Sequence, residues 1–278
     1  MPRDLSDVLH YFLPELEAAD ESASSPPAPA KPPRDAGDTG GGEDRPRPPS
    51  PWPILALPVG ERDVVRAALT WNLAVEIARR GASACVLAPS TEGESPLWPS
   101  AGVGPLGTEL HLHPAKTPED LHTAAREQAR RSADRTRSDG LVFVCLPPDW
   151  LERGEPTHQP FEWWLLLTSS RQRDLQEAYA LIRRLLDSNP EIEIGVTIHG
   201  VQSIREAREA FERLARACEH RLGVSPTSFG LLVDDLHVYR AIAAQRPIGL
   251  EHPQAPATRA LMDVARLLHE SIGSRCHD

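Results

Sequence analysis

The sequence lacks the features that mark several large classes of protein. Its four cysteines lie far apart, with no CxxC pair, so neither a disulfide framework nor a thiolate zinc site is expected. No apolar run approaches the roughly 20 residues that a membrane-spanning helix needs, and a signal peptide is not expected. A net charge of -10 disfavours nucleic acids and anionic membranes, because their phosphates would repel the protein. We therefore expect a cytoplasmic protein that binds other proteins, with no metal site and no nucleic-acid partner.

Proline, in contrast, is abundant and clustered, with 28 in the chain. Residues 20–53 consist almost entirely of Pro, Gly, Ser, Ala and charged residues. A segment of this composition cannot bury enough surface to offset its chain entropy, so it is predicted to be a disordered linker. The N-terminal region is therefore expected to contribute no part of the folded core.

Residues 1–19 place apolar side chains at the i, i+3, i+4, i+7 spacing of one helical face, interrupted at Pro14. The apolar positions of this face are Leu5, Val8, Leu9, Phe12, Leu13 and Leu16. The polar face is acidic, which suits a protein groove better than an anionic lipid surface. We predict a short amphipathic docking motif for a protein partner. The alternative is that the motif folds back on its own domain.

From residue 54 onward, apolar runs alternate with amphipathic segments, which is typical of βαβ units and a mostly parallel sheet. The predicted strands are 54–58, 84–88, 109–113, 141–146, 163–168, 192–198 and 229–233. The predicted helices are 62–80, 117–137, 172–187, 203–220, 236–245 and 257–272. The fold class is therefore a three-layer α/β/α domain over residues 54–273.

Three stretches of this domain, taken together, resemble the MinD/ParA class of P-loop ATPases, and within it flagellar-number regulators of the FlhG/FleN type. The first is ILALPVGERDVVRAALTWNLAVEIARRGASACVLAPS, with Asn72-Leu73-Ala74 and Gly81 at the family's positions. The second, residues 165–218, is similar to the family's central strand, its Ala-Tyr helix and the following strand. The third, residues 229–268, holds an Asp pair and an Ala-x-x-x-Gln-x-Pro run. The resemblance implies a MinD-like P-loop NTPase fold and a role in placing a cell-surface or polar machine.

The phosphate loop departs from this family. A working loop needs glycines, so that backbone N–H groups can approach the phosphates, and a lysine to neutralise them. The corresponding positions here hold Gly60, Glu61, Arg62, Asp63, Val65, Arg66 and Ala67. Gly60 is kept, but Glu61 and Arg66 stand at the two lysines, and Ala67 offers no hydroxyl to magnesium. ATP and magnesium are therefore not expected as cofactors, although Arg66 leaves a weak anion site open.

The other nucleotide contacts that the resemblance implies are also altered. Anchoring the switch II strand on Pro147 puts Cys145 where the family has an aspartate, and the base-contacting Asn corresponds to His199. Cys145 lies in the apolar run LVFVCL, so an inert core thiol is favoured over a nucleophile paired with His158 or His199.

Two further sets of residues have simpler structural explanations. His111 and His113 are expected on a rim strand rather than at a metal. Asp234 and Asp235 are expected to cap the following helix, and Trp163-Trp164 to pack in the core.

The predicted function is that of a non-catalytic pseudo-ATPase, a protein-binding spatial regulator or assembly factor. One alternative is a nucleotide-sensing or slow ATPase that uses Arg66. Another is a regulatory heterodimer partner of a competent ParA/MinD paralogue, and a homodimer is also open. The C-terminal helix lacks the basic amphipathic tail by which MinD-like relatives bind membranes, so no strong membrane anchor is expected.

Overall fold

The computed structural model describes residues 50–60, 63–90, 100–136, 139–152 and 160–277. The predicted docking motif at residues 1–19, together with Glu61, Arg62 and His158, lies outside these ranges. Within them, the strands are β1 Ile54–Pro58, β2 Ser83–Pro89, β3 Gly102–Val103, β4 Glu109–His113, β5 Gly140–Leu146, β6 Trp163–Ser169, β7 Glu193–Val201 and β8 Thr227–Val233. The helices are α2 Val64–Arg79, α3 Pro118–Thr136, α4 Pro148–Glu152, α5 Gln172–Ser188, α6 Ile204–Leu222, α7 Leu236–Ala243, α8 Ile248–Glu251 and α9 Pro256–His277, with a 3-10 turn at Pro105–Gly107.

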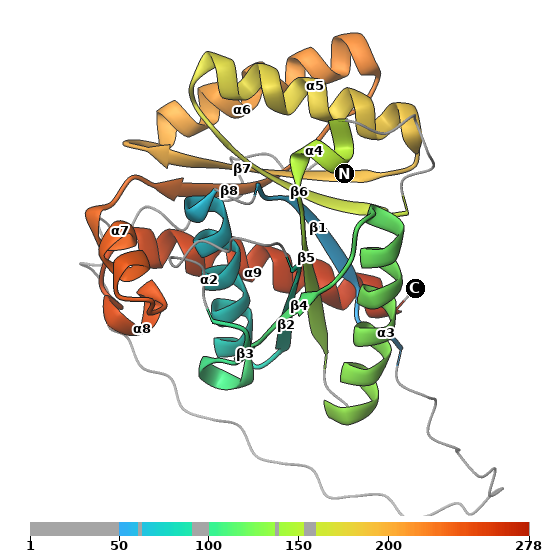
Figure 1. Cartoon of the computed structure of the whole chain (residues 1–278). Coiled ribbons are helices and arrows are strands. Elements are labelled where there is room, and N and C mark those ends of the chain that lie inside the picture. The colour runs from blue at the N-terminus through green and yellow to red at the C-terminus, as the bar shows by residue number, and fades with distance from the viewer. Residues whose placement is uncertain (1–49, 61–62, 91–99, 137–138, 153–159, 278) are drawn as a thin grey trace, which may run out of the picture.

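The strands of the described residues form one sheet in the order β3-β4-β2-β5-β1-β6-β7-β8. All neighbours pair in parallel except β3 and β4, where the two residues of β3 add an antiparallel edge. Helices α3, α5 and α6 cover one face, and α2 and α9 cover the other (Figure 1). The predicted three-layer α/β/α architecture is confirmed.

The alternation of side chains along β1 shows how the two layers of core arise. Leu55 and Leu57 belong to the cluster under α2 and α9, whereas Ala56 between them belongs to the cluster under α3, α5 and α6. Successive residues of a strand point to opposite faces, and both faces of this sheet are covered. Each central strand is therefore apolar on both sides, as the runs in the sequence indicated.

The structure corrects several boundaries. Trp52, assigned to the linker, is only 4% exposed and belongs to the core beside α3. Its indole lies against Gly140, where a Cβ would come within 2.3 Å of the ring, so the folded part begins before residue 54. Helix α9 continues to His277, past the predicted end of the helix at residue 272 and of the domain at residue 273. The sequence pattern also missed β3, α4 and α8, because each is too short to show a period.

No helix in the described part of the chain is both long and apolar enough to cross a membrane.

Candidate functional site at the carboxyl edge of the sheet

The carboxyl ends of the parallel strands meet at one edge of the sheet, which is where open α/β sheets bind ligands. Beyond β1, the Val59 N–H donates to the Leu146 carbonyl oxygen at 2.9 Å, which joins the ends of β1 and β5. The Gly60 carbonyl then accepts from the Asp63 N–H at 2.9 Å. A Cβ on Gly60 would lie 3.8 Å from its nearest neighbours, so this retained glycine is not required by any close approach.

Asp63 occupies the N-terminus of α2. Its Oδ1 accepts a hydrogen bond from the Arg66 N–H at 3.0 Å, which makes it the N-cap of the helix. Its Oδ2 lies 3.1 Å from Nη1 of Arg66 in a partly exposed ion pair. A helix N-terminus attracts anions because its first N–H groups lack partners. Here the protein's own carboxylate meets that demand.

The next residues of α2 turn into the core instead of the site. Ala67 is 2% exposed and packs in the cluster shared with α9, and Val65 packs against the same cluster from a half-buried position. The hydroxyl of Thr70 donates to the Arg66 carbonyl at 2.8 Å, within the helix. None of the described residues at the start of α2 therefore presents a hydroxyl to a metal at this edge.

Cys145 is a core residue, as its apolar surroundings in the sequence indicated. It pairs with Leu57 across β5 and β1, is 1% exposed, and has a thiol pKa raised by burial to about 12. A thiol of that pKa stays protonated and is a poor nucleophile. Pro147 is buried just beyond the strand, and its carbonyl accepts from the Trp150 N–H at 3.0 Å as α4 begins.

His199 lies near the end of β7, opposite Ser169 of β6. Its Nε2 is buried and has no hydrogen-bond partner among the described residues. Burial lowers the pKa of the ring, and the positive charge of Arg66 lowers it further while Asp63 opposes this. The imidazole is therefore neutral at pH 7. The structure thus brings His199 together with Asp63 and Arg66, three residues that the sequence analysis had singled out.

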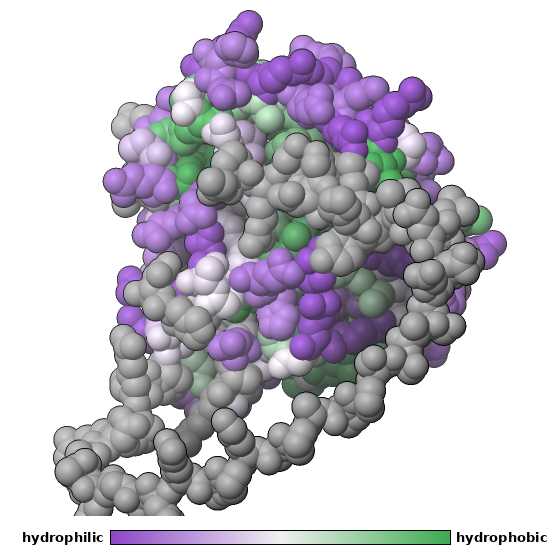
Figure 2. All heavy atoms as spheres, turned by 180° about the vertical axis from the view of Figure 1, so that it is seen from behind, coloured by the Kyte–Doolittle hydropathy of each residue, from purple (hydrophilic) through white to green (hydrophobic). Residues whose placement is uncertain are grey.

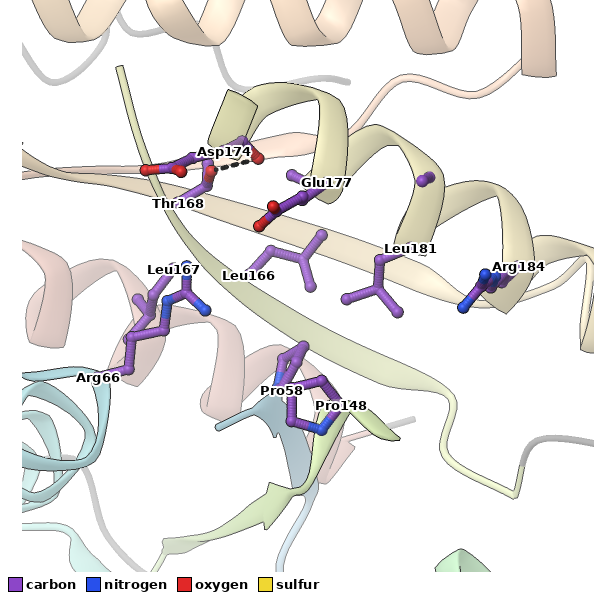
Figure 3. Close-up of a pocket in the computed structure, with 12 residues that line it drawn as sticks. Pro58, Arg66, Pro148, Leu166, Leu167, Thr168, Asp174, Glu177, Leu181 and Arg184 are labelled. Carbon is purple, nitrogen blue, oxygen red and sulfur yellow. Dashed lines mark hydrogen bonds between the residues drawn. The ribbon is translucent and has the colours of Figure 1, made fainter. Parts of the chain in front are cut away.

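A cavity of about 260 Å³ opens beside Arg66, between β6 and α5 (Figure 3). Asp174, Glu177 and Arg184 of α5 line it, and the Thr168 hydroxyl donates to the Asp174 carbonyl at 3.1 Å. The Asp174 carboxylate also accepts from the Ser169 hydroxyl. The sequence analysis missed these α5 residues, although their place directly after a buried strand was a usable signal. Their mixed charges make the cavity a poor receptor for a polyanion.

The remaining candidates have structural roles. Asp235 caps α7, accepting from the His237 N–H at 2.9 Å, and its second oxygen accepts from the Ala257 N–H of α9 at 3.2 Å, so the capping prediction is confirmed for Asp235. Asp234 instead accepts from the Gln202 side-chain amide at 3.0 Å. Trp163 and Trp164 are both buried, as predicted. His111 lies 2.9 Å from the Glu109 carboxylate, and the described residues hold no cluster of three possible metal ligands.

No protein-family model matches the chain, and no curated protein matches it in sequence. Solved structures do match. MinD in the MinC:MinD complex of Aquifex aeolicus superposes with a TM-score of 0.54 at 15% identity, over 78% of this chain and 95% of that one. A ParA family ATPase of Chlorobium tepidum gives 0.54 at 12% identity, over 78% and 99%. MinD of Pyrococcus horikoshii, solved with Mg-ADP, gives 0.52 at 12% identity, over 81% and 98%.

This chain has the MinD/ParA fold. The likeness extends over nearly the whole length of each of these proteins, so the fold is complete in this chain. At identities of 12–15% it establishes the architecture alone, and what this edge of the sheet does has to be argued from its own residues.

Proposed function

We propose that this protein has the MinD/ParA fold without its nucleotide chemistry, and that it serves as a protein-binding spatial regulator or assembly factor for a cell-surface or polar machine. The observation that carries the proposal is the Asp63 carboxylate, which caps α2 and pairs with Arg66 where a P-loop protein would hold a phosphate.

Electrostatics set the expected penalty for a nucleotide at this place. Two like charges 4 Å apart repel by about 1 kcal/mol in water and by about 4 kcal/mol near a protein surface. Each 1.4 kcal/mol is a tenfold loss of affinity, so Asp63 alone would weaken phosphate binding by roughly 5-fold to 700-fold. Arg66 cannot offset this in full, because its guanidinium is already paired with the same carboxylate.

A second candidate function is nucleotide sensing, and one observation favours it. Arg66 still lies on a cavity at the carboxyl edge, next to the neutral His199. Opening the Asp63–Arg66 pair would free a cation there. A third possibility is that the chain regulates a competent ParA/MinD paralogue as its dimer partner, and a homodimer is the related case.

Titration of the full chain with fluorescent ATP and Mg²⁺ separates these functions. We expect no binding at micromolar nucleotide, for the wild type and for Arg66→Ala alike. Arg205→Ala is the matched control for the loss of one positive charge, because Arg205 is an exposed arginine of α6, far from α2 in the sequence. Micromolar binding that is lost in Arg66→Ala and kept in Arg205→Ala would overturn the proposal in favour of nucleotide sensing.

A further inference from the structure

A groove of about 480 Å³ lies between α5 and α6, on a different side of α5 from the cavity beside Arg66. Its apolar part is formed by the buried Leu175 and Leu214 and by the half-buried Tyr179 and Ala217. In Figure 2 the upper part of the molecule, where α5 and α6 lie in Figure 1, is mostly hydrophilic, with apolar side chains showing between the polar ones. An apolar floor between two helices is a common receptor for a third, amphipathic helix.

The rim of this groove is basic, in a protein whose net charge is -10. Arg213, Arg216, His220 and Arg221 of α6 line it, and no acidic residue does. Arg213 donates to the Ser170 carbonyl at 3.1 Å and Arg216 to the Glu212 carbonyl at 3.2 Å. These partners are uncharged, and within the described ranges none of the three arginines forms an ion pair. Their positive charge therefore stays available to an acidic ligand.

We propose that this groove is the docking surface for residues 1–19 of the same chain. Those residues combine apolar side chains, which match the floor of the groove, with acidic side chains, which match its basic rim. Their apolar set includes Leu5, Leu9 and Phe12, and their charged positions are mainly acidic, with Asp4, Asp7, Glu15 and Glu17 against a single arginine, Arg3. Apolar side chains fill the floor while the carboxylates face the arginines of the rim.

The length of the connecting chain permits this contact. Residues 20–49 separate the motif from Ser50, where the described structure begins. A flexible chain of this length has an end-to-end distance of about 30 Å. A folded domain of this size has a radius of gyration of about 17 Å, and thus a diameter of about 45 Å. The linker can span that distance, because its fully extended length is about 100 Å.

Tethering also makes a weak contact effective. A flexible linker presents the motif at an effective concentration on the order of 1 mM. If the untethered motif bound the groove with a dissociation constant of about 100 μM, the tethered motif would be bound in roughly nine molecules out of ten. The consequence is regulation, because a partner that uses the apolar face of residues 1–19 must first displace it from α5 and α6. This inference goes beyond the proposed function and does not depend on the loss of nucleotide binding.

Photo-crosslinking of the full chain tests the contact directly. With benzoylphenylalanine at Phe12, irradiation should join this position to peptides of α5 or α6. Mixing isotopically light and heavy chains before irradiation distinguishes a contact within one molecule from one between copies. Light–light and heavy–heavy products alone, on α5 or α6, support the proposal. Mixed products, crosslinks on other elements or no crosslink at all overturn it.

Charge reversal provides the specificity control. Arg213→Glu combined with Arg216→Glu should weaken the contact about tenfold, as expected from two exposed charge contacts turned repulsive, so the crosslink yield should fall to roughly half of the wild-type value. Arg205→Glu, on the same helix and outside the groove, should leave the yield unchanged. Adding Asp4→Arg and Asp7→Arg to the double variant should restore it. A yield that the double reversal does not change, with an unaltered circular dichroism spectrum, would exclude the groove. None of these outcomes bears on the ATP titration.

Discussion

The two ends of α2 carry different kinds of interaction. At its N-terminus, Asp63 and Arg66 form a partly exposed pair with each other, three residues apart in the sequence. Farther along, Asn72 accepts from the Ile248 N–H at 2.7 Å and donates to the Ala68 carbonyl at 2.7 Å. Arg79 reaches the Gly249 carbonyl at 2.6 Å. The polar groups at the N-terminus of α2 are paired with each other, whereas the second half of the helix holds α8 against the core. Ligand chemistry can thus be lost from a helix whose packing role is kept.

Glu76, in the second half of α2, is only 2% exposed, unlike the partly exposed pair of Asp63 and Arg66 at the N-terminus. Burial raises the pKa of its carboxyl group, and the positive charge of Arg79 opposes that rise. Its side chain occupies the space that Gly249 leaves by lacking a Cβ. A buried carboxyl group needs such fitted surroundings, so α2 and α8 are matched to each other at this point.

The largest effect is expected from Asn72→Ala. It leaves the buried N–H of Ile248 without a partner, which should lower the free energy of unfolding by about 2–3 kcal/mol. For a domain of this size the melting temperature should fall by about 5–10 °C. Gln202→Ala removes an exposed amide that contacts Asp234 and should cost far less. Equal losses of stability for the two variants in thermal and urea unfolding would show that the hydrogen bond between Asn72 and Ile248 contributes no more than an exposed contact.

A smaller loss is expected from Gly249→Ala. The new Cβ would lie 1.9 Å from Oε1 of the buried Glu76, so the Glu76 carboxylate must leave its place or one of the two helices must shift, at a cost of about 2 kcal/mol. Gly273→Ala is the matched control, because that glycine lies within α9 with no atom near a new Cβ. There we expect a gain of about 0.5–1 kcal/mol from helix propensity. A neutral Gly249→Ala in urea unfolding would mean that Glu76 is not held against α8.

The smallest of the three effects is expected at the other end of α2. Asp63→Ala removes the N-cap and should cost about 1 kcal/mol, whereas Asp63→Asn keeps a capping oxygen and should cost only a few tenths. The partly exposed ion pair with Arg66 adds less than about 1 kcal/mol. If urea unfolding instead gives the same loss for Ala and Asn, the charge pair and not the cap stabilises this end.

Most of the architecture could be predicted from the sequence, because periodicity reports which faces of an element are buried. The runs at 141–146 and 163–168 were enough to predict two central strands, and the buried Cys145 followed from its neighbours. Trp52 was missed because its prolines and charged neighbours belong to the linker composition, while its burial depends on Gly140, far along the chain. The residues of α5 beside Arg66 were missed because their place beside α2 depends on the order of the strands, although their position after a buried strand was a usable signal.

What the sequence by itself determined is the order of the longer strands and helices, the apolar core and the residue types at the altered loop. These follow from local composition and spacing. The tertiary structure decided which side chains meet. Asn72 and Ile248 lie 176 positions apart, and the groove of α5 and α6 exists only because β6 and β7 are neighbours in the sheet. Such contacts depend on strand order and helix packing, which no local pattern encodes.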